Sequence, residues 1–326
     1  MGKRGKHLMT DTNEEFSVVE AEDKYIVKSK GLRRSRPGLH PTEASCKFVE
    51  DGRTRVIGKC QRAAWYRSMQ IYTREGASPG LMQKAHLGKW DEEGVVDRWK
   101  EMGIWVDNNI KFYQKSHFLS GELDAVLRNP KTDGLLGIEV KSFYGYYANK
   151  EVTGAKRDQI PGVPKEPHFL QAILYAWEYR DVLEEFRLYY IERGDGHRVE
   201  FRLGFDENDD GTHQVWWQQV AGKYWNYYSP MKVVQLYTIE DIYKRYEELI
   251  QLLKNKTLPP KDFSDKWDDD TVEWMWDHGY LGKTKYTAWQ KNPSKNPCGD
   301  WQCGYCDYKA QCVQDELTTA MDARNT

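Results

Sequence analysis

Residues 120–142 read Ser-Gly-Glu-Leu-Asp-Ala-Val-Leu-Arg-Asn-Pro-Lys-Thr-Asp-Gly-Leu-Leu-Gly-Ile-Glu-Val-Lys-Ser, a pattern that predicts a two-stranded hairpin. Polar and apolar side chains alternate over residues 122–128, as expected for a strand with one buried face. The run at 129–134 holds the Asn, Pro, Asp and Gly residues that favour turns. The apolar run at 135–140 then predicts the second strand, so the two strands should pair antiparallel.

The hairpin carries three charged residues that we expect to lie together. Successive side chains of a strand point to opposite faces, so Glu139 and Lys141 share one face while Ile138 and Val140 face the core. Asp124 of the partner strand can then lie beside Glu139. Two carboxylates and a lysine on rigid strands would suit Mg²⁺ or Mn²⁺, with an ammonium group to polarise a water or a phosphate oxygen.

The alternative is that Glu139 and Lys141 form an ordinary solvated surface pair, which contributes little to stability. The apolar neighbours Ile138 and Val140 are typical of a central strand. Inward-facing charges on such a strand are costly unless they bind something. The sequence therefore favours a metal site over a surface pair.

Composition excludes several classes of protein. The chain has 326 residues, enough for one large domain with appendages or for two domains. Its net charge of −2 gives no whole-chain argument for nucleic-acid binding. No apolar stretch approaches the roughly 18 residues of a membrane span, and we expect a soluble, cytoplasmic protein with no membrane partner. Its six cysteines are then better read as metal or cluster ligands than as disulfides.

Hydrophobic periodicity predicts further elements on both sides of the hairpin. On one predicted helix, His86, Glu93 and Asp97 fall near one face; on another, Gln171 and Tyr175 lie one turn apart, opposite the apolar stripe. The expected elements are helices over 60–71, 81–102, 168–180, 213–228 and 239–255, a polar loop over 145–167, and a second hairpin of 186–192 with 199–205.

The cysteines near the carboxyl end form a tight group. Cys303 and Cys306 are separated by two residues and Cys312 follows, a spacing that can present thiolates to one metal or cluster. Cys298 as fourth ligand would make a local zinc site, whereas Cys60 would join segments far apart in the sequence. Spacing leaves both open. Unligated thiols are the least expected outcome, because the segment from 259 onward has too few apolar residues for a core of its own.

Taken in order, these motifs resemble those of the RecB-like branch of the PD-(D/E)xK nuclease superfamily. The most similar members are the iron–sulfur ones, typified by CRISPR-associated RecB-like exonucleases and AddB-type nuclease domains. The resemblance runs from about Cys60 to Cys312; Cys46 and Cys298 are additional to the pattern. The matching positions are His86, Asp124, Glu139, Lys141, Gln171, Tyr175, Cys60 in Cys-Gln-Arg, Cys303, Cys306 and Cys312.

The resemblance implies an α/β fold with a restriction-endonuclease-like core, in which helices flank a mixed central sheet. We expect that core at residues 45–258. Residues 1–44 would be a polar tail or strap. Residues 259–326 would be a cysteine-rich segment that closes onto the core through a [4Fe–4S] cluster held by Cys60, Cys303, Cys306 and Cys312.

The resemblance also implies a Mg²⁺- or Mn²⁺-dependent deoxyribonuclease, an exonuclease rather than an endonuclease. Its substrate would be single-stranded DNA or DNA ends, and it would work with protein partners in repair or recombination. Asp124 and Glu139 would hold the metal together with His86 and the Val140 carbonyl. Lys141 would position the nucleophile. Gln171 and Tyr175 would orient Lys141 or contact the DNA.

Two alternatives remain at this point. One is a non-catalytic DNA-binding or scaffold protein that keeps the nuclease fold and carries a zinc site at its carboxyl end. The other concerns Tyr144, Tyr146 and Tyr147, just past Lys141, which could either pack in the protein or stack on unpaired bases.

Overall fold

The computed structural model describes residues 17–29, 38–71, 79–156, 160–224 and 231–325. A seven-stranded mixed sheet has the order β3-β4-β5-β6-β7-β8-β9; β5 and β6 run parallel and the other neighbours antiparallel. Its strands are β3 (Trp105–Gln114), β4 (Leu119–Arg128), β5 (Leu135–Phe143), β6 (Glu185–Glu192), β7 (Arg198–Glu207), β8 (His213–Ala221) and β9 (Lys232–Thr238).

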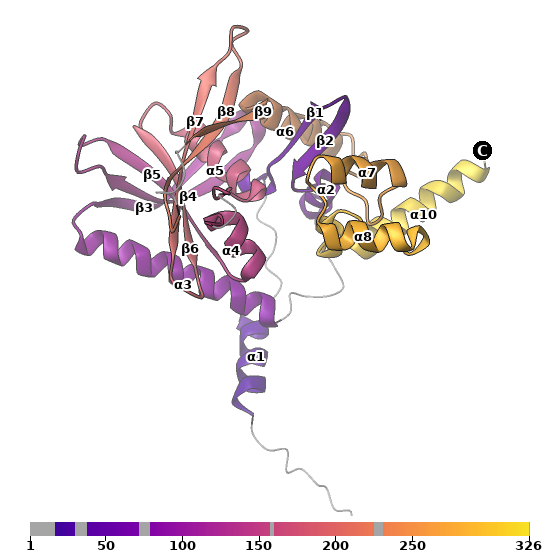
Figure 1. Cartoon of the computed structure of the whole chain (residues 1–326), viewed down its shortest axis with the longest axis horizontal. Helices are drawn as coiled ribbons and strands as arrows, with labels where there is room; N and C mark the ends of the chain where they lie inside the picture. The colour runs from indigo at the N-terminus through magenta and orange to yellow at the C-terminus, as the bar shows by residue number, and fades with distance from the viewer. Residues whose placement is uncertain (1–16, 30–37, 72–78, 157–159, 225–230, 326) are drawn as a thin grey trace, which may run out of the picture.

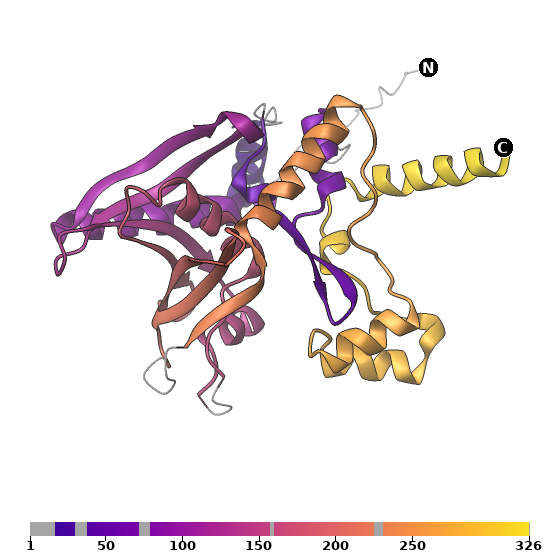
Figure 2. The same cartoon turned by 90° about the horizontal axis from the view of Figure 1, so that it is seen from above.

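Helices cover the sheet and continue beyond it (Figure 1). A separate two-stranded sheet lies between the large sheet and the carboxyl-terminal helices (Figure 2). The small sheet consists of β1 (Ser45–Glu50) and β2 (Arg53–Gly58); the helices are α1 (Val18–Ser29), α2 (Gln61–Ser68), α3 (Pro79–Glu101), α4 (Tyr146–Thr153), α5 (Glu166–Glu178), α6 (Ile239–Lys254), α7 (Asp269–Asp277), α8 (Lys283–Lys291), α9 (Trp301–Gly304) and α10 (Lys309–Asn325).

The two faces of the sheet bury different helices. Val95 and Trp99 of α3 pack in one cluster with Ile138 and Val140 of β5. The other face packs against α5, whose Leu170 lies in the main core. The predicted alternation of β5 is therefore confirmed, since Ile138 and Val140 point into a core. The opposite face is also covered, so charged side chains there lie inside the fold.

Most of the predicted elements are present. The opening hairpin is β4 and β5, the second hairpin is β6 and β7, and the helices expected over 60–71, 81–102, 168–180 and 239–255 correspond to α2, α3, α5 and α6. The expected loop over 145–167 is interrupted by α4.

The helix expected over 213–228 is wrong. The first part of this stretch is strand β8, in which Val215, Trp217 and Gln219 are buried at every second position. That period of two is the signature of a strand, and the aromatic content of the stretch concealed it. Residues 225–228 lie outside the described part of the chain.

The segment after residue 258 has a small core of its own, contrary to the sequence-based expectation. Val272, Leu281, Trp289 and Cys298 are buried together, and Trp276 stacks on Tyr286 with ring centroids 4.2 Å apart. This segment has few aliphatic residues, and large aromatic rings form its core in their place, because each ring buries a large apolar area.

A buried ion pair attaches this segment to the rest of the protein. Arg245 of α6 donates to Asp262 Oδ1 at 2.7 Å, and the side chains are only 6% and 7% exposed. The second oxygen of Asp262 accepts the backbone N–H of Gln61 at 2.6 Å. Asp262 therefore fixes the start of α2, and with it the position of the neighbouring Cys60.

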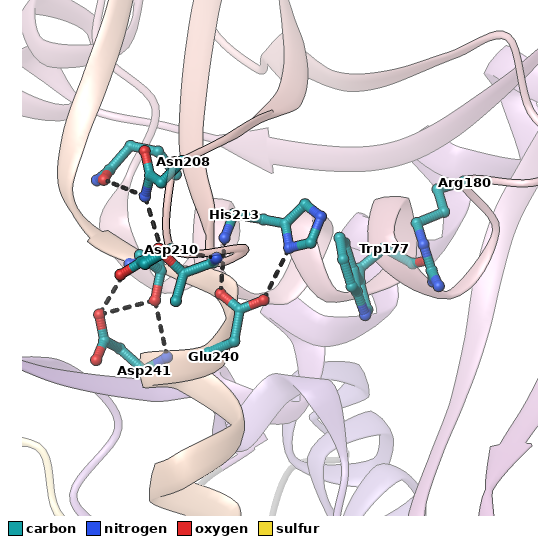
Figure 3. A network of polar contacts seen from close by, with 10 residues as sticks. Trp177, Arg180, Asn208, Asp210, His213, Glu240 and Asp241 are labelled. Carbon is teal, nitrogen blue, oxygen red and sulfur yellow. Dashed lines mark hydrogen bonds and ion pairs between the residues drawn. The ribbon is translucent and has the colours of Figure 1, made fainter.

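The beginning of α6 is fixed to the sheet by a second polar network (Figure 3). Glu240 accepts the backbone N–H of His213 at 3.0 Å, and its other oxygen lies 2.9 Å from the His213 ring. The Trp177 ring lies 4.6 Å from that imidazole, and the Arg180 guanidinium lies 4.0 Å from the Trp177 ring. These contacts join the end of α5, the start of β8 and the start of α6.

Of the segment expected as a polar tail or strap, the described part forms α1 and a short turn at Pro41–Glu43. α1 lies against α3 (Figure 1). Within the described ranges, no helix is long and apolar enough to cross a lipid bilayer.

The Asp262–Arg245 pair leads to a stability prediction. We expect Asp262→Ala to lower the free energy of unfolding by roughly 3–5 kcal/mol, because it removes the buried counter-charge of Arg245 and leaves only the more exposed Glu248 carboxylate. Glu248→Ala is the matched control: Glu248 accepts from the same guanidinium at 2.9 Å but is 40% exposed, and its loss should cost about 1 kcal/mol or less. Urea denaturation measures both. Equal losses would contradict the role given to burial.

Candidate functional site

The charged site lies where β4 and β5 separate. The two strands pair from Arg128↔Leu135 to Ala125↔Ile138. Beyond that point the backbone N–H of Val140 donates to Asp124 Oδ2 at 2.7 Å. A carboxylate therefore accepts from β5 where a strand carbonyl would otherwise do so, and this holds Asp124 beside Glu139.

Glu139 is the most deeply buried charged group of the site, with a side chain 1% exposed. Its Oε1 accepts from Lys141 Nζ at 2.5 Å and from Gln171 Nε2 at 2.7 Å. Its Oε2 is also buried but has no hydrogen-bond donor among the described residues. Buried polar atoms are usually partnered, so this unpartnered oxygen indicates a position for a ligand.

The α5 helix supplies the polar side chains opposite the strands. Gln171 and Tyr175 lie one turn apart, with Gln171 Nε2 and the Tyr175 hydroxyl 3.5 Å apart. The Tyr175 ring passes close to β4 at Gly121, where a Cβ atom would lie only 2.6 Å from it. Gly121 is thus required for the sheet to accept the ring.

Burial dominates the electrostatics of this group. It raises the pKa of Asp124, against the opposing effect of Lys141. Burial and the nearby charge of Asp124 raise the pKa of Glu139. Burial alone would lower the pKa of Lys141, but the two carboxylates outweigh it and the pKa lies above its usual value. Lys141 is therefore a permanent cation, and the site has one positive charge for two buried acids.

A third acid, Glu92 of α3, belongs to the same electrostatic group and was not predicted. Burial and then the charge of Asp124 raise the pKa of Glu92 to about 7. The two acids that the sequence pattern placed near the face of His86 lie outside the site: Glu93 and Asp97 have side chains 58% and 72% exposed. The missed signal was spacing, since Glu92 precedes the buried Val95 and Val96 by three and four residues.

His86 is not brought to the carboxylates by any described contact. Its ring lies 6.5 Å from that of Trp90 on the same helix. Its Nε2 is buried and has no hydrogen-bond partner among the described residues. The role predicted for His86 as a metal ligand therefore remains a prediction, as does that of the Val140 carbonyl.

Four of the six cysteines line one pocket at the other end of the protein. Cys60 comes from the start of α2, and Cys303, Cys306 and Cys312 come from the region of α9 and α10. The pocket holds about 440 Å³ of space, part of it open to solvent. Arg62 donates to Cys312 Sγ at 3.3 Å and to the Pro259 carbonyl at 2.8 Å, which joins α2 to the returning chain.

The remaining two cysteines lie elsewhere. Cys298 is buried in the small aromatic core, with its sulfur 3.8 Å from the Lys285 carbonyl, and Cys46 is buried in the main core. In the cysteine pocket, burial raises the pKa of Cys303 to about 12 and also raises those of Cys60 and Cys306. These thiols are therefore protonated at neutral pH when no cation is bound.

No group of three or more His, Cys, Asp or Glu side chains among the described residues is arranged to hold a metal ion as it stands. Comparison with protein-family models, curated proteins and solved structures found no match. Function has to be inferred from the chemistry of the two sites.

The crowded acids of the hairpin lead to a second stability prediction. We expect Asp124→Asn to raise the free energy of unfolding in EDTA by about 1 kcal/mol, because it removes a buried negative charge while its carbonyl can still accept from Val140. Its amide can also donate to Glu139. The control Asp133→Asn, at a turn position 84% exposed, should change stability by less than about 0.5 kcal/mol. A fall in stability for Asp124→Asn would overturn the idea that the acids repel.

Proposed function

We propose that this protein is a metal-dependent DNA nuclease with a PD-(D/E)xK core. The single observation that carries the proposal is Glu139: it is buried, it is held by Lys141 and Gln171 through one oxygen, and its other oxygen is unpartnered beside Asp124. A surface ion pair has no such arrangement. An excess of buried acids is rare where side chains serve only stability. Active sites bury such acids in order to bind cations or protons.

The donor set fits a hard divalent cation. Asp124 and Glu139 offer carboxylate oxygens, the ligands that Mg²⁺ and Mn²⁺ prefer, and Glu92 of α3 adds negative charge near Asp124. The unpartnered Oε2 of Glu139 is a free donor atom within this group. When bound, such a cation lowers the pKa of a water and offsets charge on the scissile phosphate.

The chain's own residues have separable roles in phosphodiester hydrolysis. Lys141 is a fixed cation that would position the attacking water or neutralise charge that develops on the phosphate. Gln171 holds Glu139, and so fixes the direction in which its second oxygen points. Tyr175, one turn further along α5, limits the space on the side of β4. The motif resemblance favours cutting from DNA ends over internal cutting.

We also propose that the four-cysteine pocket holds a structural [4Fe–4S] cluster. The pocket gathers Cys60 with Cys303, Cys306 and Cys312, four thiols of the kind that such clusters use, while Cys298 lies in a different core. Arg62, which donates to Cys312, supplies a positive charge beside the sulfurs. The cluster would stabilise the fold as a cross-link does, since it would join Cys60 to three cysteines far away in the sequence.

The nuclease proposal is tested with end-labelled single- and double-stranded DNA in Mg²⁺ or Mn²⁺. We expect Asp124→Asn and Lys141→Ala each to reduce cleavage at least about 100-fold, because the first removes a carboxylate that would hold the metal and the second removes the cation that acts on the water or phosphate. Lys131→Ala, in the exposed hairpin turn, is the control for loss of a lysine and should cut normally.

Absence of cleavage by the unmodified protein on both substrates, with DNA binding retained, would support the non-catalytic DNA-binding alternative. Normal cleavage by both Asp124→Asn, which is expected to fold at least as stably as the unmodified protein, and Lys141→Ala would remove the hairpin from the mechanism.

The cluster is tested by iron, sulfide and zinc analysis of protein purified without oxygen. We expect about four irons per chain and visible absorbance, both lost in Cys60→Ser and retained in Cys298→Ser. Stoichiometric zinc that is lost in Cys298→Ser instead would replace the cluster with a local zinc site.

A further inference from the structure

Three tyrosines immediately after β5 are strongly exposed. Tyr144, Tyr146 and Tyr147 are 74%, 75% and 86% exposed, although they follow a strand in the interior of the sheet. Of the two outcomes expected from the sequence, packing in the protein is therefore wrong for all three rings. Ile160 and Val163, at the far end of the same segment, are exposed as well, at 45% and 40%. Grouped exposed apolar side chains usually mark a binding surface.

The backbone fixes this aromatic group close to the charged site. Phe143 points inward and packs edge-on against Tyr190, with ring centroids 5.8 Å apart, so the chain is anchored just before Tyr144. Gly145, at a φ of +101°, then turns the backbone into α4. At about 3.3 Å per residue along a strand, Tyr144 lies roughly 10 Å from Lys141. That distance corresponds to a few nucleotides of DNA.

The rings offer flat surfaces at different angles. Tyr146 and Tyr147 lie next to each other at the start of α4, with ring centroids 5.4 Å apart and planes at 80°. Together with Tyr144 they can contact bases that are not held parallel to one another. A duplex keeps its bases paired and stacked, so rings of this kind favour unpaired bases.

The charge of the segment suits a polyanion. Residues 143–165 contain four Lys or Arg against two Asp or Glu, in a chain whose total charge is −2. Lys165 lies at the start of α5, with its ammonium 6.0 Å from the Phe143 ring. Aromatic rings combined with local positive charge are what single-stranded DNA binding requires: stacking for the bases and cations for the phosphates.

We propose that Tyr144, Tyr146 and Tyr147 form a stacking surface for the unpaired bases of single-stranded DNA that enters the Asp124–Glu139–Lys141 site. The inference rests on the proposed nuclease function, and it names the surface that would select unpaired strands for that site. Because the surface is separate from the reacting groups, it controls the affinity and strand preference of the site and leaves the hydrolytic step to the hairpin.

The test is fluorescence anisotropy of a labelled single-stranded oligothymidylate and of a matched duplex, in EDTA so that nothing is cut. We expect the unmodified protein to bind the single strand at least about tenfold more tightly than the duplex. The triple variant Tyr144→Ala, Tyr146→Ala, Tyr147→Ala should lose at least about tenfold in affinity for the single strand and little for the duplex. The triple Phe variant keeps the rings and should bind the single strand within about twofold of the unmodified protein.

Tyr113→Ala is the control for loss of an exposed tyrosine, since Tyr113 is 57% exposed on β3. It should leave binding unchanged. Circular dichroism checks that the triple Ala variant is folded; all three side chains are exposed, so we expect an unchanged spectrum. A folded triple Ala variant that binds the single strand as tightly as the unmodified protein would overturn the stacking surface, and so would equal loss for both DNA forms.

The two proposals can fail separately. Single-strand binding that depends on the tyrosines, without cleavage in Mg²⁺ or Mn²⁺, would keep the stacking surface and remove the nuclease. Cleavage that depends on Lys141, with tyrosine variants that bind and cut single strands normally, would keep the nuclease and assign the tyrosines to another partner, such as a protein.

Discussion

The burial of the Glu139 carboxylate is the constraint on which this structure depends. An ionised carboxylate inside a protein is strongly destabilising unless it is paired and hydrogen-bonded. Here Lys141 from the same strand and Gln171 from α5 compensate one of its oxygens. This requirement fixes the distance between α5 and the sheet, and it keeps polar groups on the face of β5 opposite α3 inside a packed core.

The local part of this arrangement could be predicted from the sequence. The turn residues and the alternation of β5 depend only on neighbouring side chains, so they were sufficient to place Glu139 and Lys141 on one face. The spacing of four between Gln171 and Tyr175 likewise predicts one helix face. Strand alternation and helical spacing each depend on a few consecutive residues, and in this protein the tertiary contacts favour the same arrangement.

The parts that were missed depend on how distant segments meet. Spacing from the buried Val95 and Val96 places Glu92 on the inner side of α3, but only the tertiary fold brings that side near Asp124. Cys60, and not Cys298, lies with the other three cysteines of the pocket because Asp262 fixes the start of α2 and aromatic rings enclose Cys298. At β8, the clustered aromatic residues led to the prediction of a helix, although the buried positions follow a period of two, which is typical of a strand.

The cysteine pocket has a consequence for the order in which the protein matures. The hydrogen bond from Arg62 to Cys312 spans 250 residues. At about 5–20 residues per second, the ribosome needs roughly 12–50 s to synthesise the chain between them. Throughout that interval α2 is present without the segment that covers it, and Cys60 is open to oxidants. Newly made chains therefore expose this thiol, and a factor that protects it would have to act during translation.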